Sequence, residues 1–128
     1  MERHSRRLPV FLNLVQIRFP IGAIASIAHR VAGVLLFIAL PVFALLLDAS
    51  LRTEAGFATV RDLFSSPFWV VTAAVLLWAL VYHVLAGVRH LLMDVGVGSE
   101  LVRARTSARL VLVAAPALTL VILVWGLT

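Results

Sequence analysis

The sequence predicts an all-α membrane protein, in which three transmembrane helices follow a short amphipathic N-terminal segment. Of the 128 residues, 62% are hydrophobic and 13% are charged, whereas a soluble domain averages about 45–50% apolar and about 25% charged residues. The mean hydropathy is +1.09, and three segments reach the length of about 20 mainly apolar residues that a bilayer core requires. This composition argues against disorder and against most soluble enzyme folds. The length indicates one domain covering residues 1–128.

The N-terminal segment, residues 8–20, is expected to lie at the membrane surface. Its apolar patch is interrupted by Asn13, Gln16, Arg18 and Pro20, whereas a secretory signal needs a cleaner apolar stretch of about 7–15 residues. We therefore interpret this segment as an amphipathic approach to the first span.

The three predicted spans cover about residues 21–47, 68–92 and 110–127. Pro41 falls inside the first span, where a membrane tolerates a kink. Pro67 directly precedes the second span, at a position where proline commonly starts a helix. Pro116 lies within the third span.

The arginines predict how these spans cross the membrane. All eleven basic residues are Arg. Four lie in residues 1–20 and four in residues 89–109, which makes eight, against two in residues 48–67. The positive-inside rule then places the N-terminus and the second loop in the cytoplasm, and the first loop and the C-terminus in the periplasm. We expect a multi-pass protein of the bacterial inner membrane, whose positive charge sets topology and does not serve nucleic-acid binding.

The chain contains no cysteine. This excludes disulfides, zinc–cysteine sites, iron–sulfur ligation and covalent attachment of c-type haem by this chain. A redox centre held here would therefore need histidine or a similar ligand.

Polar residues within the first span form one group of interest. Ionisable residues inside a membrane are costly and suggest a functional site. Ser26, His29, Arg30 and Gly33 follow the spacing i, i+3, i+4 and i+7, so they share one helix face near the cytoplasmic end. Taken singly, Ser26 could bond to its own helix and Arg30 could extend to the interface.

The second span carries a matching group. His83, Gly87 and His90 share a face, which Asp94 continues, while Arg89 points elsewhere. His83 lies about 22 Å along the helix from the start of the span, on the cytoplasmic half of the bilayer. Gly87 leaves room for a flat group to approach. Helix packing alone could also explain the histidine and the glycine.

The two groups suit redox cofactors if they meet in one leaflet. Neutral imidazole binds haem iron, and His29 and Arg30 could pair with haem propionates. A hydroxyl and a cation beside an apolar pocket could hold a quinone carbonyl. His83 is the one strong buried axial-ligand candidate, so a second ligand would come from another chain.

Two motifs resemble the cytochrome b556 subunit family of succinate dehydrogenase. They are RFPIGAIASIAHRVAG at residues 18–33 and YHVLAGVRHLLMD at residues 82–94, and the resemblance covers essentially the whole chain. It implies a haem b shared with a second anchor subunit, ubiquinone as substrate, and an iron–sulfur and a flavoprotein subunit as further partners. It gives no role for Asp94.

The resemblance also implies roles for individual residues. His83 corresponds to the haem axial ligand, and His29, Arg30 and His90 lie near the haem propionates. The quinone-site positions are Ser26, Arg30, Phe19 and Ile27, while Gly33 and Gly87 support the helix faces. Three alternatives remain open: a fumarate reductase anchor, a structural or assembly protein without a cofactor, and a transporter subunit using Arg and His as a proton path.

Overall fold

The computed structural model describes residues 18–126, which form four α-helices and no strand. They are α1 (Ile21–Arg52), α2 (Glu54–Phe64), α3 (Pro67–Asp94) and α4 (Leu101–Gly126). Of these, α1, α3 and α4 are long and apolar enough to cross a membrane. The predicted all-α fold with three spans is thus confirmed. Most of the predicted N-terminal amphipathic segment lies outside the described residues.

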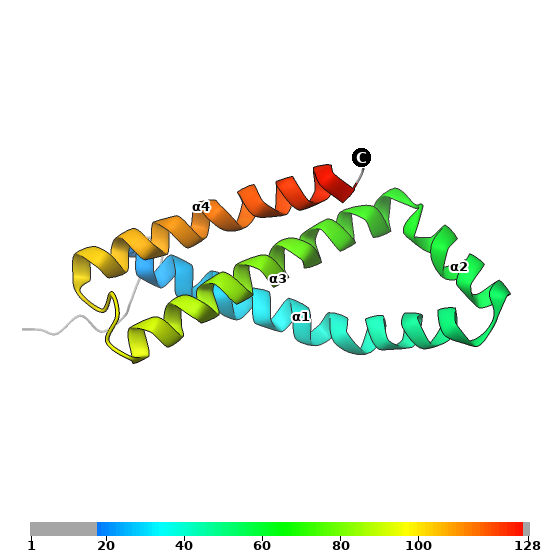
Figure 1. Cartoon of the computed structure of the whole chain (residues 1–128), viewed down its shortest axis with the longest axis horizontal. Coiled ribbons are helices and arrows are strands. Elements are labelled where there is room, and N and C mark those ends of the chain that lie inside the picture. The colour runs from blue at the N-terminus through cyan, green and yellow to red at the C-terminus, as the bar shows by residue number, and fades with distance from the viewer. Residues whose placement is uncertain (1–17, 127–128) are drawn as a thin grey trace, which may run out of the picture.

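α1 lies beside α3 and α4 near its own start and separates from both toward its end (Figure 1). α3 packs against both α1 and α4, and α1 also contacts α4. α1 and α3 diverge toward the ends that α2 joins, as Figure 1 shows. An apolar cavity of about 450 Å³ lies between these diverging ends, with Phe64 of α2 in its wall. The predicted polar groups lie in the other half, where the start of α1 lies beside α3 and α4.

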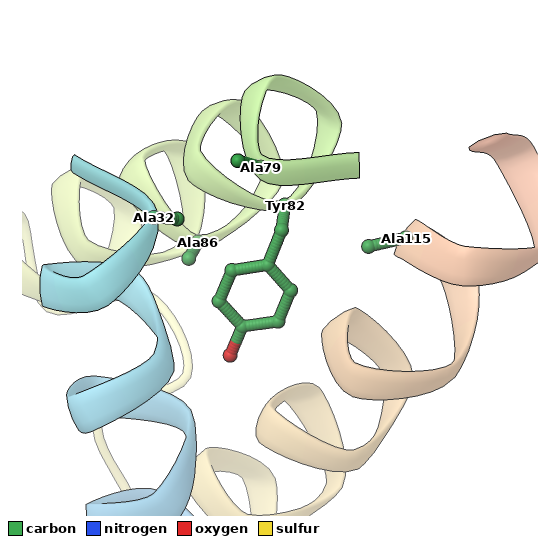
Figure 2. Close-up of a cluster of buried hydrophobic side chains, with 5 residues drawn as sticks. All are labelled: Ala32, Ala79, Tyr82, Ala86 and Ala115. Atoms are coloured by element: carbon green, nitrogen blue, oxygen red, sulfur yellow. The ribbon is translucent and has the colours of Figure 1, made fainter. Parts of the chain in front are cut away.

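Small side chains make this close packing possible. The buried core consists of Ala32, Ala79, Ala86 and Ala115 around the large ring of Tyr82 (Figure 2). Helices in a bilayer gain little from burying apolar surface away from lipid, so their contacts depend on small residues that allow a close approach. The alanines thus determine which faces of α1, α3 and α4 meet.

The helices extend beyond the apolar segments that predicted them. α1 continues to Arg52, whose Nε lies 2.7 Å from Asp48 Oδ2 one turn earlier. α4 begins at Leu101, so Arg103 and Arg105, expected in a connection, are helical. Hydropathy marks the hydrocarbon core, whereas a helix can continue through the headgroup region. The α3–α4 connection is consequently short, and it turns at Gly96 and Gly98 with φ of 84° and 74°.

α2 was not predicted from the sequence, because its 11 residues are too few to cross a membrane. Thr53 is extended and ends α1, and its Oγ1 accepts a 2.9 Å hydrogen bond from the Gly56 amide as the N-cap of α2. A Cβ at Gly56 would overlap the carbonyl oxygen of Ala49. Glycine is therefore required where the chain folds back from α1. Pro67 stands at the start of α3, as predicted.

Candidate functional site

Three histidines from two helices meet at the closely packed end of the bundle. The ring centroid of His29 on α1 lies 4.2 Å from that of His83 and 5.1 Å from that of His90, both on α3. The His29 and His90 rings are stacked, with an interplanar angle of 18°. We call these three residues the histidine cluster. The structure therefore brings together histidines from the two polar groups that were expected to meet in one leaflet.

Two glycines provide the space for this cluster. A Cβ at Gly33 would lie 2.9 Å from His83 Cε1 and 3.3 Å from its Nδ1, which is too close for an ordinary contact. A Cβ at Gly87 would lie 3.8 Å from His29 Nε2. The flat group that approaches Gly87 within this chain is thus the imidazole of His29. Gly33 in turn allows the ring of His83 to lie against α1.

Backbone carbonyls orient two of the imidazoles. His83 Nδ1 lies 3.3 Å from the carbonyl oxygen of His29, and His90 Nδ1 lies 2.7 Å from that of Ala86. In the tautomer that donates these hydrogen bonds, Nε2 of each ring keeps its lone pair. Histidines that bind metals commonly show this arrangement, since the second nitrogen's partner fixes the tautomer and ring orientation.

The third imidazole has an unsatisfied atom. His29 Nε2 is buried and has no hydrogen-bond partner within residues 18–126. A buried polar atom without a partner costs about 1–3 kcal/mol. The atom therefore marks a place where a polar group from outside these residues would be stabilising.

Residues 4–122 match the family described as succinate dehydrogenase/fumarate reductase transmembrane subunit. The chain belongs to this family. A relative in Coxiella burnetii (strain RSA 493 / Nine Mile phase I), named succinate dehydrogenase cytochrome b556 subunit, is 34% identical over 110 residues, covering 85% of this chain and 88% of the relative. A relative of the same name in Paracoccus denitrificans is 33% identical over 101 residues, covering 79% and 78%. The resemblance stated from the two motifs is thus confirmed.

The sequence predicted four residues at a quinone site: Phe19, Ser26, Ile27 and Arg30. They lie on the first turns of α1 or just before them. Ser26 is half-buried and Arg30 is exposed. Neither makes a hydrogen bond or ion pair with another residue in the described range 18–126. Phe19 and Ile27 are 45% and 47% exposed. The structure therefore leaves these side chains open to partners from outside residues 18–126.

An apolar groove extends from the histidine cluster toward the other end of the bundle. It measures about 590 Å³, and its wall begins at Gly33, beside His83. Its other lining residues come from the same faces of α1 and α3: Leu36, Phe37, Ala39, Leu40, Phe43, Leu76, Leu77 and Leu80. No group of three or more His, Cys, Asp or Glu side chains that could hold a metal ion by itself occurs among the described residues.

Two contacts beside the cluster were not predicted. Tyr82 Oη donates a buried 2.9 Å hydrogen bond to the carbonyl oxygen of Ala25. Arg89, predicted to point away from the histidine face, donates to Ser107 Oγ at 2.9 Å and to the carbonyl oxygen of Ala104 at 3.0 Å on α4. The small residues Ala79 and Ala86 on either side of Tyr82 indicate close helix packing. They do not identify the atoms to which Tyr82 and Arg89 donate.

Proposed function

We propose that this chain is a membrane-anchor cytochrome b subunit of a bacterial succinate dehydrogenase. In this proposal it binds haem b together with a second anchor subunit and forms part of the site where ubiquinone is reduced. A flavoprotein subunit oxidises succinate, and an iron–sulfur subunit passes the electrons to the quinone. The observation that carries the proposal is His83, held in the histidine cluster with Nδ1 against a backbone carbonyl. The names of both relatives support it.

His83 is the proposed axial ligand of the haem iron. Its contact with the His29 carbonyl favours the tautomer with a free Nε2 lone pair and fixes the orientation of the ring. The haem supplies reversible one-electron redox chemistry when bound. The apolar groove that begins at Gly33 suits a large flat apolar group.

The haem propionates are proposed to interact with His29, Arg30 and His90. A carboxylate accepts hydrogen bonds strongly from cationic donors. The exposed guanidinium of Arg30 is available for such a pair. The buried Nε2 of His29, which lacks a partner among residues 18–126, would gain one there.

The quinone is proposed to bind beside Ser26 and Arg30. The Ser26 hydroxyl donates a hydrogen bond to a quinone oxygen, and Arg30 stabilises the negative charge that develops during reduction. Phe19 and Ile27 supply apolar contacts to the ring. Two electrons and two protons convert ubiquinone to ubiquinol, so this chain takes part in quinone chemistry and does not act on succinate.

The cytoplasmic ends of the spans are proposed to carry this site. The arginines of α4 and the histidine cluster lie toward the same end of the bundle. Under the positive-inside rule this end faces the cytoplasm, where soluble subunits could dock. The C-terminus then faces the periplasm.

Substitutions in the assembled complex test these roles. His83→Leu is expected to remove the reduced b-type absorption spectrum, and a normal spectrum would refute the ligand role. Ser26→Ala and Arg30→Leu are expected to lower succinate:ubiquinone reductase activity. Ser50→Ala and Arg52→Leu are the matched controls, since Ser50 bonds within its own helix and Arg52 is exposed at the far end of α1. Unchanged activity in both test variants would refute the quinone site.

The family description also includes fumarate reductases. A complex that reduces fumarate with quinol much faster than it oxidises succinate would favour that direction. The comparison requires both assays on one purified complex.

A further inference from the structure

We propose that Tyr82 and Arg89 are positioning residues that fix the rotation of α3 about its axis and so hold His83 and His90 against α1. Each precedes one of these histidines directly in the sequence. This inference rests on the proposed haem role of His83. It adds two residues that neither contact the reacting groups nor belong to the predicted site.

Tyr82 ties α3 to α1. It is the largest fully buried side chain within the described part of the chain, with 1% of its surface exposed. Its ring lies between α1 and α4 in Figure 2, and its hydroxyl donates to the carbonyl oxygen of Ala25 at 2.9 Å. Ala25 adjoins Ser26 and lies one turn before His29. The hydrogen bond therefore links the helix of His83 directly to the polar face of α1.

Arg89 ties α3 to α4. Its Nε donates to Ser107 Oγ at 2.9 Å, and its Nη2 donates to the carbonyl oxygen of Ala104 at 3.0 Å. Ser107 Oγ in turn donates to the same carbonyl at 3.2 Å. The planar guanidinium holds two acceptors in a fixed geometry, which a lysine cannot do. This side of α3 is thereby attached to the first turns of α4.

The spacing of these residues explains why the contacts control rotation. Tyr82 and Arg89 are seven residues apart and lie within about 20° of each other around the helix. His83 and His90 form a second stripe, about 100° away. Because Tyr82 and Arg89 are attached to α1 and α4, they determine which way His83 and His90 point from α3.

A small rotation would matter at the iron. At a side-chain radius of about 5–6 Å, a rotation of about 20° moves an imidazole by about 2 Å. Metal–ligand distances in proteins hold to about 0.2 Å. Loss of either attachment is therefore expected to alter how His83 presents its nitrogen, even where the helix bundle still assembles.

The test uses the whole purified complex with Tyr82→Phe, Arg89→Leu and Arg89→Lys. Tyr82→Phe keeps the ring and removes only the hydroxyl. We expect its ferric haem EPR signal to shift and broaden, and haem transfer to apomyoglobin to become about five-fold faster, as for loss of one buried hydrogen bond. Arg89→Leu is expected to cause the same two changes. Arg89→Lys is expected to cause smaller changes than Arg89→Leu.

Two controls separate positioning from general packing. Thr119→Val removes a buried hydroxyl that bonds within its own helix, and Arg103→Leu removes an exposed arginine from the same end of α4. Both should keep the wild-type EPR signal.

The outcomes distinguish this inference from the proposed function. Unshifted EPR signals and wild-type haem transfer in Tyr82→Phe and Arg89→Leu overturn the inference alone. So does a lower yield of complex whose remaining haem is spectroscopically normal, because that would show a purely structural role. A wild-type complex without haem, or His83→Leu that keeps its haem, overturns the proposed function and this inference with it.

Discussion

Replacing Gly33 by alanine is expected to weaken haem binding while leaving α1 intact. The added Cβ would lie 2.9 Å from His83 Cε1, whereas carbon atoms in contact prefer about 3.5–4.0 Å. The imidazole must therefore move by at least about 0.6 Å. His83 Nδ1 is already 3.3 Å from the His29 carbonyl oxygen, so this movement is expected to break the hydrogen bond.

The size of the effect follows from two costs. An imidazole forced away from its preferred rotamer costs about 0.5–1.5 kcal/mol, and a lost hydrogen bond costs about 0.5–1.5 kcal/mol. Together they amount to about 1–3 kcal/mol, or roughly a 5- to 150-fold weaker affinity for haem. Alanine stabilises a helix interior by about 0.5–1 kcal/mol relative to glycine. Haem affinity and helix stability should thus change in opposite directions.

Haem titration of the purified complex, with thermal unfolding measured in parallel, checks this prediction. Gly22→Ala is the matched control, because it lies on the same helix and its Cβ would meet no atom within 4 Å. It should gain helix stability and keep wild-type haem affinity. Wild-type haem affinity in Gly33→Ala would contradict the close contact between Gly33 and His83.

Three further predictions concern the connections between the spans. Gly56→Ala places its Cβ against the rigid carbonyl of Ala49, so the free energy of unfolding should fall as for an overpacked site, by about 1–3 kcal/mol. The thermal midpoint should fall with it, and an unchanged midpoint would contradict this. Thr53→Ala removes the N-cap of α2 and should cost about 1 kcal/mol, whereas Thr53→Ser should cost little. The chain has no native cysteine, so Ser99→Cys and Ser65→Cys can report topology. An impermeant maleimide added to spheroplasts should shift only the Ser65→Cys chain on a gel, and labelling of Ser99→Cys alone would reverse the proposed orientation.

Much of the candidate site could be predicted because its signals are local. His83, Gly87 and His90 recur at helical spacing, and His29 and Gly33 do the same on α1. Such spacing fixes which side chains share a face of one helix, whatever surrounds it. The contact of His29 with both other rings agrees with that expectation.

Other features escaped prediction for physical reasons. The amphipathic α2 is shorter than a membrane span, so its hydropathy does not distinguish it from a polar connection. Arg103 and Arg105 suggested a loop, although charged residues continue a helix readily once it has left the hydrocarbon. The partners of Tyr82 and Arg89 are backbone carbonyls and a serine on other helices, and no sequence pattern identifies such acceptors.

The sequence by itself determined the three apolar spans, the surplus of arginine at their proposed cytoplasmic ends and the helix faces that carry histidine. These depend on hydropathy and periodicity within each segment. Only the tertiary structure decided that Gly33 meets His83, that the ring of His29 lies over Gly87, and that α3 is tied to both neighbours. The lipid-facing and protein-facing sides of a span are both apolar, so the rotation of each helix depends on close packing between residues far apart in the chain.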